Sequence, residues 1–147
     1  AMLYGARRPT YDIDITPSAA PENLRRLSDA LRELKAGIRV DDLDEGLPFN
    51  SSAESMRGMQ MLNLRSPSGD LDITFCPAGF PGGYATLEPR AHAYTVGTIT
   101  IHVADLSDVI RSKETAARPK DLDALPELIT LARTHKRDSG PPRPAPQ

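Results

Sequence analysis

The chain has 147 residues, the length of one ordinary domain, and 39% of them are hydrophobic against 26% charged. This balance excludes a disordered or fibrous protein. The net charge of −2 excludes nucleic-acid binding through bulk positive charge. The single Cys76 excludes a disulfide framework and a cysteine-rich zinc site, so we expect a cytoplasmic protein. No apolar run is as long as a membrane span, and we expect no membrane partner.

The first part of the chain predicts a strand, a helix and a second strand. Residues 1–4 are typical of the last turn of a helix that Gly5 closes, so we expect a domain shortened at its N-terminal end. Residues 11–16 alternate apolar and acidic side chains, which predicts a strand. Leucines at helical spacing in residues 21–34 predict an amphipathic helix. A short strand at residues 38–40 and an acidic loop are expected to follow.

The middle of the chain predicts a hairpin. Residues 59–65 and 70–75 are the expected strands, and the sequence Ser-Pro-Ser-Gly at 66–69 is the expected turn. A short helix is possible at residues 84–90, in a region rich in Gly and Pro. Val and Ile residues between 96 and 103 predict one or two further strands.

Two helices are expected in the last part of the chain. Asp105 or Ser107 can cap the first of them, and the polar break at residues 117–119 ends it. Leucines at helical spacing predict the last helix. Pro126 either lies in the first turn of that helix, with Asp123 as its cap, or kinks it.

These elements predict an α+β fold, in which helices flank a mixed β-sheet. We expect one domain at residues 1–137. The Ser-, Gly- and Pro-rich tail at residues 138–147 is predicted to be disordered.

Acidic residues alternate with apolar ones on two of the predicted strands. Asp12 and Asp14 project to one side of their strand while Ile13 faces the core, and Asp70 and Asp72 repeat the pattern. If the strands are neighbours, up to four carboxylates meet, and such a cluster needs cations or raised pKa values. Mg²⁺ suits oxygen ligands, and two such ions can promote displacement at phosphorus. The alternative is an ordinary solvent-facing side of a half-exposed sheet.

A second group of candidate residues lies near the break between the last two helices. Lys113 lies at the border of the apolar face of its helix, where it either extends along the surface or contacts a phosphate. Lys120 and Asp121 begin the next helix. Favourable interaction with the helix dipole is the simpler interpretation of Asp121.

Three sequence blocks occur in order along the chain and together resemble a known family. They are Gly5-x-x-Arg8-x-Thr10-x-Asp12-Ile13-Asp14-Ile15, Gly69-Asp70-Leu71-Asp72-Ile73, and Lys113 followed by Arg118-x-Lys120-Asp121-x-Asp123-Ala124-Leu125. The chain resembles, over residues 1–135, the minimal nucleotidyltransferases of the AbiEii toxin type. These belong to the polymerase-β-like nucleotidyltransferase superfamily, so the resemblance implies a small core of that type.

The resemblance implies Mg²⁺-dependent transfer of NMP from an NTP, with two ions during catalysis. Asp12 and Asp14 would hold the ions, with Asp72 as the third metal-binding carboxylate, which would also activate the acceptor hydroxyl. Lys113 would contact the triphosphate, and Asp121 would complete the catalytic set. The implied substrate-binding residues are Gly5, Ala6, Arg8, Thr10, Arg118 and Lys120.

The resemblance also implies a toxin of a bacterial toxin–antitoxin system. Some toxins of this family add nucleotides to the 3′ end of tRNA, so tRNA is a possible acceptor and an antitoxin a possible partner. The family motif usually has Ser where this chain has Ala6. That difference and the expected short N-terminal end leave an alternative: an antitoxin-type or catalytically degenerate module that binds a partner. An antitoxin that transfers AMP to its toxin is a related alternative.

Overall fold

The computed structural model describes residues 4–5 and 12–138 and shows a mixed α+β fold. Its main sheet has five strands in the order β1-β5-β4-β2-β3. Only the pairing of β1 with β5 is parallel within this sheet, among the strands that the structure describes. The strands are β1 (Asp12–Ile15), β2 (Gly37–Val40), β3 (Leu43–Leu47), β4 (Met61–Ser66) and β5 (Gly69–Thr74).

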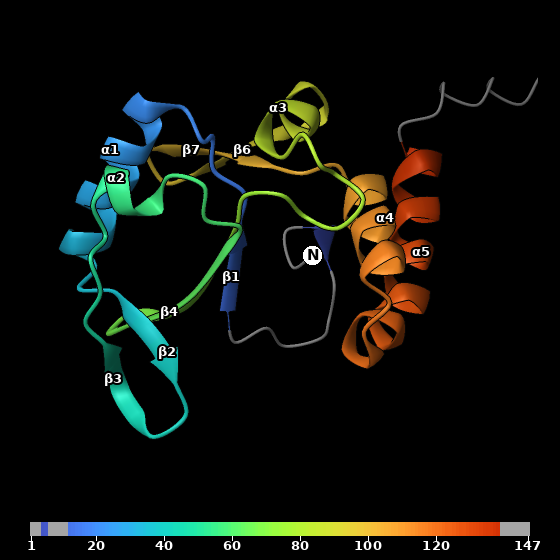
Figure 1. Cartoon of the computed structure of the whole chain (residues 1–147). Helices are drawn as coiled ribbons and strands as arrows, with labels where there is room; N and C mark the ends of the chain where they lie inside the picture. The colour runs from blue at the N-terminus through green and yellow to red at the C-terminus, as the bar shows by residue number, and fades with distance from the viewer. Residues whose placement is uncertain (1–3, 6–11, 139–147) are drawn as a thin grey trace, which may run out of the picture.

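Helices and a separate hairpin surround this sheet (Figure 1). Helices α1 and α2 lie on one side, and α4 and α5 form a pair beyond β1. The remaining elements are α1 (Pro21–Glu33), α2 (Ala53–Met56), α3 (Tyr84–Leu87), the 3₁₀ helix η2 (Glu88–Arg90), β6 (His92–Val96), β7 (Ile99–Val103), α4 (Leu106–Ala116) and α5 (Pro119–Asp138). Strands β6 and β7 pair with each other as a two-stranded antiparallel sheet. No helix among the described residues is long and apolar enough to cross a membrane.

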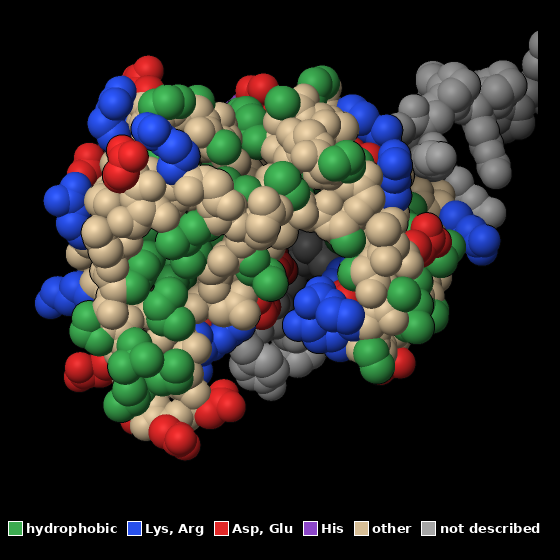
Figure 2. Space-filling view, in the orientation of Figure 1, with side chains coloured by type: hydrophobic (Ala, Val, Ile, Leu, Met, Phe, Trp, Pro, Cys, Tyr) green, Lys and Arg blue, Asp and Glu red, His purple; other side chains and the backbone are tan. Residues whose placement is uncertain are grey.

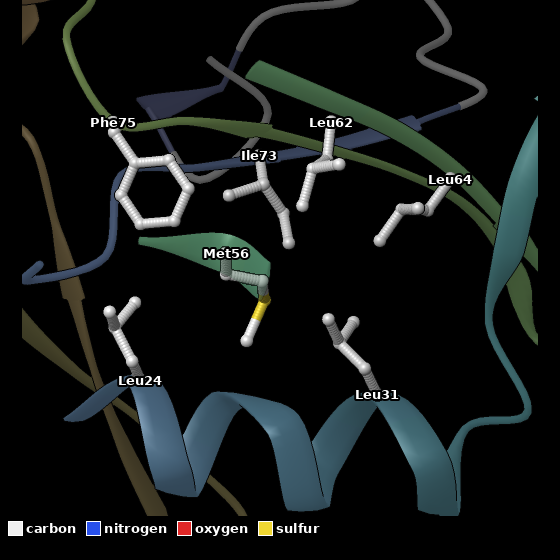
Figure 3. Close-up of a cluster of buried hydrophobic side chains, with 7 residues drawn as sticks. All are labelled: Leu24, Leu31, Met56, Leu62, Leu64, Ile73 and Phe75. Carbon is white, nitrogen blue, oxygen red and sulfur yellow. The ribbon is translucent and has the colours of Figure 1, made fainter. Parts of the chain in front are cut away.

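The main core lies between α1 and the apolar face of the sheet. On β4, buried Leu62 and Leu64 alternate with exposed residues, which is the pattern of a strand with one buried face. Leu24 and Leu31 are seven residues apart and therefore lie on the same face of α1. Both point from α1 toward that strand face (Figure 3). The seven buried members are Leu24, Leu31, Met56, Leu62, Leu64, Ile73 and Phe75.

A second, smaller core joins α4, α5 and the β6–β7 hairpin. Leu106 of α4, Leu128 of α5 and Tyr4 are its buried members. The Tyr4 hydroxyl donates a hydrogen bond to the carbonyl of Ala104 at 2.8 Å. Burial, with the neighbouring hydroxyl of Tyr94, raises the pKa of Tyr4 to about 12. Tyr4 therefore remains a neutral donor at physiological pH and fixes the start of the described chain to this core.

Most predicted elements are confirmed, including the hairpin of β4 and β5 and the cap of α4. The side chain of Asp105 accepts a hydrogen bond from the Ser107 amide, so Asp105 is the cap. The acidic loop expected after β2 instead contains β3. Gly46 makes this pairing possible, because it has φ +71° and a Cβ there would lie 2.8 Å from the carbonyl oxygen of Ile38.

One local prediction is wrong, and one of the two alternatives for Pro126 is excluded. Ile13 is 66% exposed rather than buried, because β1 is an edge strand and only its Ile15 packs against the main core. Pro126 does not lie in a first turn capped by Asp123, because α5 begins earlier, at Pro119. Proline is well suited to a first helical position, so the polar break itself starts the helix. The tail predicted at residues 138–147 begins one residue later than expected, because Asp138 still belongs to α5, and its residues 139–147 lie outside the described residues, as do residues 1–3 of the predicted helical turn.

Replacing Leu64 tests the main core. Leu64 is 0% exposed, so Leu64→Ala should lower the free energy of unfolding by about 2–5 kcal/mol, through lost burial and a residual cavity. Met61 is on the same strand and 55% exposed, so Met61→Ala should cost about 0.5 kcal/mol or less. Urea unfolding followed by circular dichroism measures both. Equal losses would contradict the assigned orientation of β4.

Candidate functional site

Four carboxylates line one face of the sheet where β1 pairs with β5. The parallel register places Asp12 beside Asp70 and Asp14 beside Asp72. Residues two apart on a strand share a face, and neighbouring strands lie about 4.8 Å apart. All four side chains therefore belong to the face opposite the main core, which confirms that the two acidic alternations are neighbours. We call this group the acidic face.

Two arginines from the adjacent strands bind part of the acidic face. Arg65 Nε lies 2.9 Å from Asp70 Oδ1, and its Nη2 lies 3.3 Å from Asp70 Oδ2. Arg39 Nη1 lies 3.3 Å from Asp70 Oδ2. The hydrogen bond from Arg65 and the charges of both arginines hold the pKa of Asp70 below its usual range. Both carboxylate oxygens of Asp70 are thus bound by arginines of the sheet.

Asp72 is bound less completely than Asp70. Arg39 Nη2 lies 2.9 Å from Asp72 Oδ1, close enough for an ion pair but without the alignment of a hydrogen bond. That oxygen is buried and accepts no hydrogen bond from the residues that the structure describes. Buried carboxylate oxygens without a hydrogen bond are uncommon, and a bound ion is one explanation for such an atom. Asp72 is therefore the less fully bonded carboxylate of β5, and Arg39 is its ion-pair partner.

The pKa of Asp14 is raised above its usual range, in contrast to that of Asp70. Although the residue keeps exposed surface, burial of its carboxyl group raises the pKa. The neighbouring charges of Asp12 and Asp72 raise it further, whereas Lys113 and Lys120 lower it. Asp14 thus interacts both with like charges on the sheet and with cations that come from α4 and α5.

The cations are fixed at the junction of α4 and α5 by a buried carboxylate. Ala117 ends α4 in the left-handed conformation with φ 49°, so the chain reverses before α5. The reversal brings Lys113 Nζ to 3.0 Å from Asp121 Oδ1, and Arg118 Nε lies 2.6 Å from Asp121 Oδ2. Asp121 is 1% exposed. Burial raises its pKa, but the hydrogen bonds from Arg118 and Lys113 outweigh this effect and the pKa is lowered.

Opposite charges face each other across a hollow in the surface. Figure 2 shows acidic side chains inside the hollow beside the sheet and basic side chains on the α4–α5 side of it. Arg118 interacts electrostatically with Asp14 and Asp72 as well as with Asp121. Such an arrangement can bind a ligand that carries both phosphates and metal ions, because each wall attracts one of them.

The structure brings together most of the residues predicted from sequence. Those that lie near one another are Asp12, Asp14, Asp72, Lys113, Arg118, Lys120 and Asp121. Gly5 lies elsewhere, against α5, where it lines a cavity with Pro126 and Leu131. The predicted substrate-binding residues Ala6, Arg8 and Thr10 lie outside the described residues.

Asp121 and the two sheet arginines differ from what the sequence suggested. The carboxylate of Asp121 binds side chains on two helices, so its main role is wider than an interaction with the helix dipole. Sequence analysis did not single out Arg39 and Arg65. The strand register places them on the acidic face. Arg65 of β4 pairs with Asp70, and Gly37 of β2 pairs with Arg65, so Arg39, two residues after Gly37, lies on the same face. The alternation of side chains along β2 and β4 was the sequence signal for both arginines.

The acidic face fits divalent cations in donor type and charge. Asp12, Asp14 and Asp72 supply oxygen donors, which Mg²⁺ prefers. The repulsion that Asp12 and Asp72 exert on Asp14 would be reduced by a bound cation. As they stand, the side chains in the described part of the chain form no group of three or more His, Cys, Asp or Glu residues close enough to hold a metal. Cation binding would therefore require side-chain adjustment.

Comparison with known proteins does not assign the chain to a family. No protein-family model matches it, and no curated protein matches it significantly.

Replacing Asp121 tests the buried ion pairs. Asp121→Asn should lower the free energy of unfolding by about 3 kcal/mol at pH 7, because Lys113 and Arg118 lose their shared anion. The folded-state pKa of Asp121 is lowered, so its contribution is present above the ordinary aspartate pKa of about 4 and is lost as the pH falls through the folded-state value.

Urea unfolding at a series of pH values measures this contribution. The difference between wild type and Asp121→Asn should shrink toward acid pH. Glu114→Gln is the control, because Glu114 is exposed on the same helix as Lys113. A pH-independent difference would show that the loss is one of packing rather than of charge.

Proposed function

We propose that this protein is an Mg²⁺-dependent nucleotidyltransferase that transfers NMP from an NTP to an acceptor hydroxyl, such as the 3′ end of tRNA. The observation that carries the proposal is the in-register pairing of Asp14 with Asp72, opposite the cations of α4 and α5. The resemblance to AbiEii-type toxins supports the same activity. On this proposal the protein is a cytoplasmic toxin with a cognate antitoxin.

The basic wall of the hollow would hold the triphosphate. Lys113 and Arg118 are cations whose positions Asp121 fixes, and Lys120 adds a third charge that reaches Asp14. Charge-assisted hydrogen bonds from such groups bind phosphate oxygens strongly. Preorganised cations also stabilise the negative charge that develops on the phosphoryl group and on the leaving pyrophosphate.

The acidic face would activate the acceptor hydroxyl. Asp12, Asp14 and Asp72 would hold Mg²⁺, which when bound neutralises charge at the α-phosphate and favours in-line displacement. Asp72 would accept the proton of the acceptor hydroxyl, which requires that its ion pair with Arg39 opens. The acceptor oxygen then forms a bond to the α-phosphorus, the bond from that phosphorus to the bridging oxygen breaks, and pyrophosphate leaves.

Replacing Asp14 tests the activity. Asp14→Asn should reduce label transfer from NTPs to total tRNA at least about 100-fold, the scale expected when one preorganised electrostatic group is lost. Incorporation of radiolabel in the presence of Mg²⁺ measures it. Asp123→Asn, at an exposed position on α5, should retain full activity. No transfer by wild type to tRNA, other RNA or protein, or equal transfer by Asp14→Asn, would overturn the proposal.

A partner-binding module is the second candidate. It is favoured by the ion pairs of Arg39 and Arg65, which already bind two of the four carboxylates. Calorimetry with Mg²⁺–NTP separates the two candidates, since a module should bind no nucleotide at the acidic face. Expression of the gene alone then separates a toxin, which should arrest growth, from an antitoxin, including one that transfers AMP to its partner toxin.

A further inference from the structure

A cavity of about 520 Å³ opens between α1 and the segment that leads into α2. Arg25, Ser28 and Arg32 line it from α1, and Phe49, Asn50 and Ser51 line it from the segment. Because α1 packs on the apolar face of the sheet, this cavity lies on the side opposite the acidic face. Its volume is in the range of pockets that bind small organic ligands.

The polar groups of this cavity are largely unused. Ser28 as a residue is 5% exposed, its hydroxyl makes no hydrogen bond with any described residue, and this hydroxyl is not among the oxygens that are sealed from solvent. A hydroxyl that lines a cavity and has no protein partner can donate to a ligand and accept from one. Within the described part of the chain, the Ser51 hydroxyl and the Arg25 guanidinium also make no hydrogen bond or ion pair.

The charge of the cavity favours an anion. Arg32 forms an ion pair with Asp29, so these two charges compensate each other, and Arg25 is a cation without an ion-pair partner among the residues that the structure describes. The carboxamide oxygen of Asn50 accepts a hydrogen bond from the Ser52 amide at 3.0 Å, which leaves the amide NH₂ as a donor. A guanidinium, hydroxyl groups and an amide NH₂ are together the donors that bind phosphate oxygens.

The same cavity has an apolar wall. Phe49 is partly buried against the main core and lines the cavity beside the donors. An aromatic side chain next to phosphate donors suits a ligand that carries a ring and a phosphate, because the ring contacts the aromatic group while the donors bind the phosphate. Nucleotides have both parts.

We propose that this cavity binds one nucleotide unit, with its phosphate at Arg25, Ser28 and Ser51 and its base or ribose against Phe49. The ligand is either a free nucleoside monophosphate or a nucleotide within single-stranded RNA. The site is separate from the acidic face, and its existence does not depend on the proposed transfer reaction. If that reaction occurs on RNA, the cavity provides a second contact for the acceptor.

Calorimetry on the full chain tests this proposal, with AMP, adenosine, inorganic phosphate and a five-nucleotide single-stranded RNA as ligands. All titrations use the Asp14→Asn background and no Mg²⁺, which reduces binding at the acidic face. We expect AMP or the RNA to bind, and adenosine to bind at least tenfold more weakly. AMP binding identifies a free nucleotide as the ligand, whereas binding of RNA alone identifies a nucleotide within a strand.

Two variants on α1 locate the site. Arg25→Gln should weaken binding at least tenfold, as expected for loss of a charge-assisted contact, and Ser28→Ala should weaken it less. Arg26→Gln is the matched control, because Arg26 is the adjacent residue and forms an exposed ion pair with Glu22. Thermal unfolding checks that each variant is folded. No binding of any ligand, or equal binding by Arg25→Gln and Arg26→Gln, would overturn the proposal, whatever the outcome for label transfer.

Discussion

The candidate site depends on one interaction, the parallel pairing of β1 with β5. This pairing joins two acidic segments that are far apart in the sequence and places like charges one strand spacing from each other. Backbone hydrogen bonds and the core beneath the sheet must overcome that repulsion. Cations on two sides reduce this repulsion, Arg39 and Arg65 from the neighbouring strands and the lysines of the α4–α5 junction from beyond β1.

Two aspartates with the same local sequence pattern have different roles because of their neighbours. Asp70 lies beside Arg65 on β4, and the two arginines bind both of its carboxylate oxygens. Asp72 lies beside Asn63, which brings no charge, so one of its oxygens keeps no hydrogen bond. The register of β4 therefore decides which carboxylate is bound by two arginines and which by Arg39 alone. This distinction supports Asp72, rather than Asp70, as the third carboxylate of the proposed enzyme.

Periodicity predicted the elements whose side chains alternate between core and solvent, such as β4, β5 and α1. It did not predict β3, because that strand is acidic and exposed and forms through its pairing with β2 across Gly46. It also misplaced Ile13, since exposure on an edge strand depends on which element covers it. The spacing of residues in the sequence predicted most of the candidate site residues. It did not predict the arginines that bind Asp70 and Asp72, because their position depends on strand register, which a local sequence pattern does not contain.

The acidic and basic walls of the hollow are built on two different hydrophobic cores. The acidic wall is built on the main core through β1 and β5, whereas the basic wall is built on α4 and α5, whose apolar sides pack with Tyr4. Asp121 fixes the cations within the second unit without reaching the first. Attraction across the hollow then contributes to holding the two units together. A ligand with phosphates on one side and metal ions on the other would bind both walls and strengthen that association.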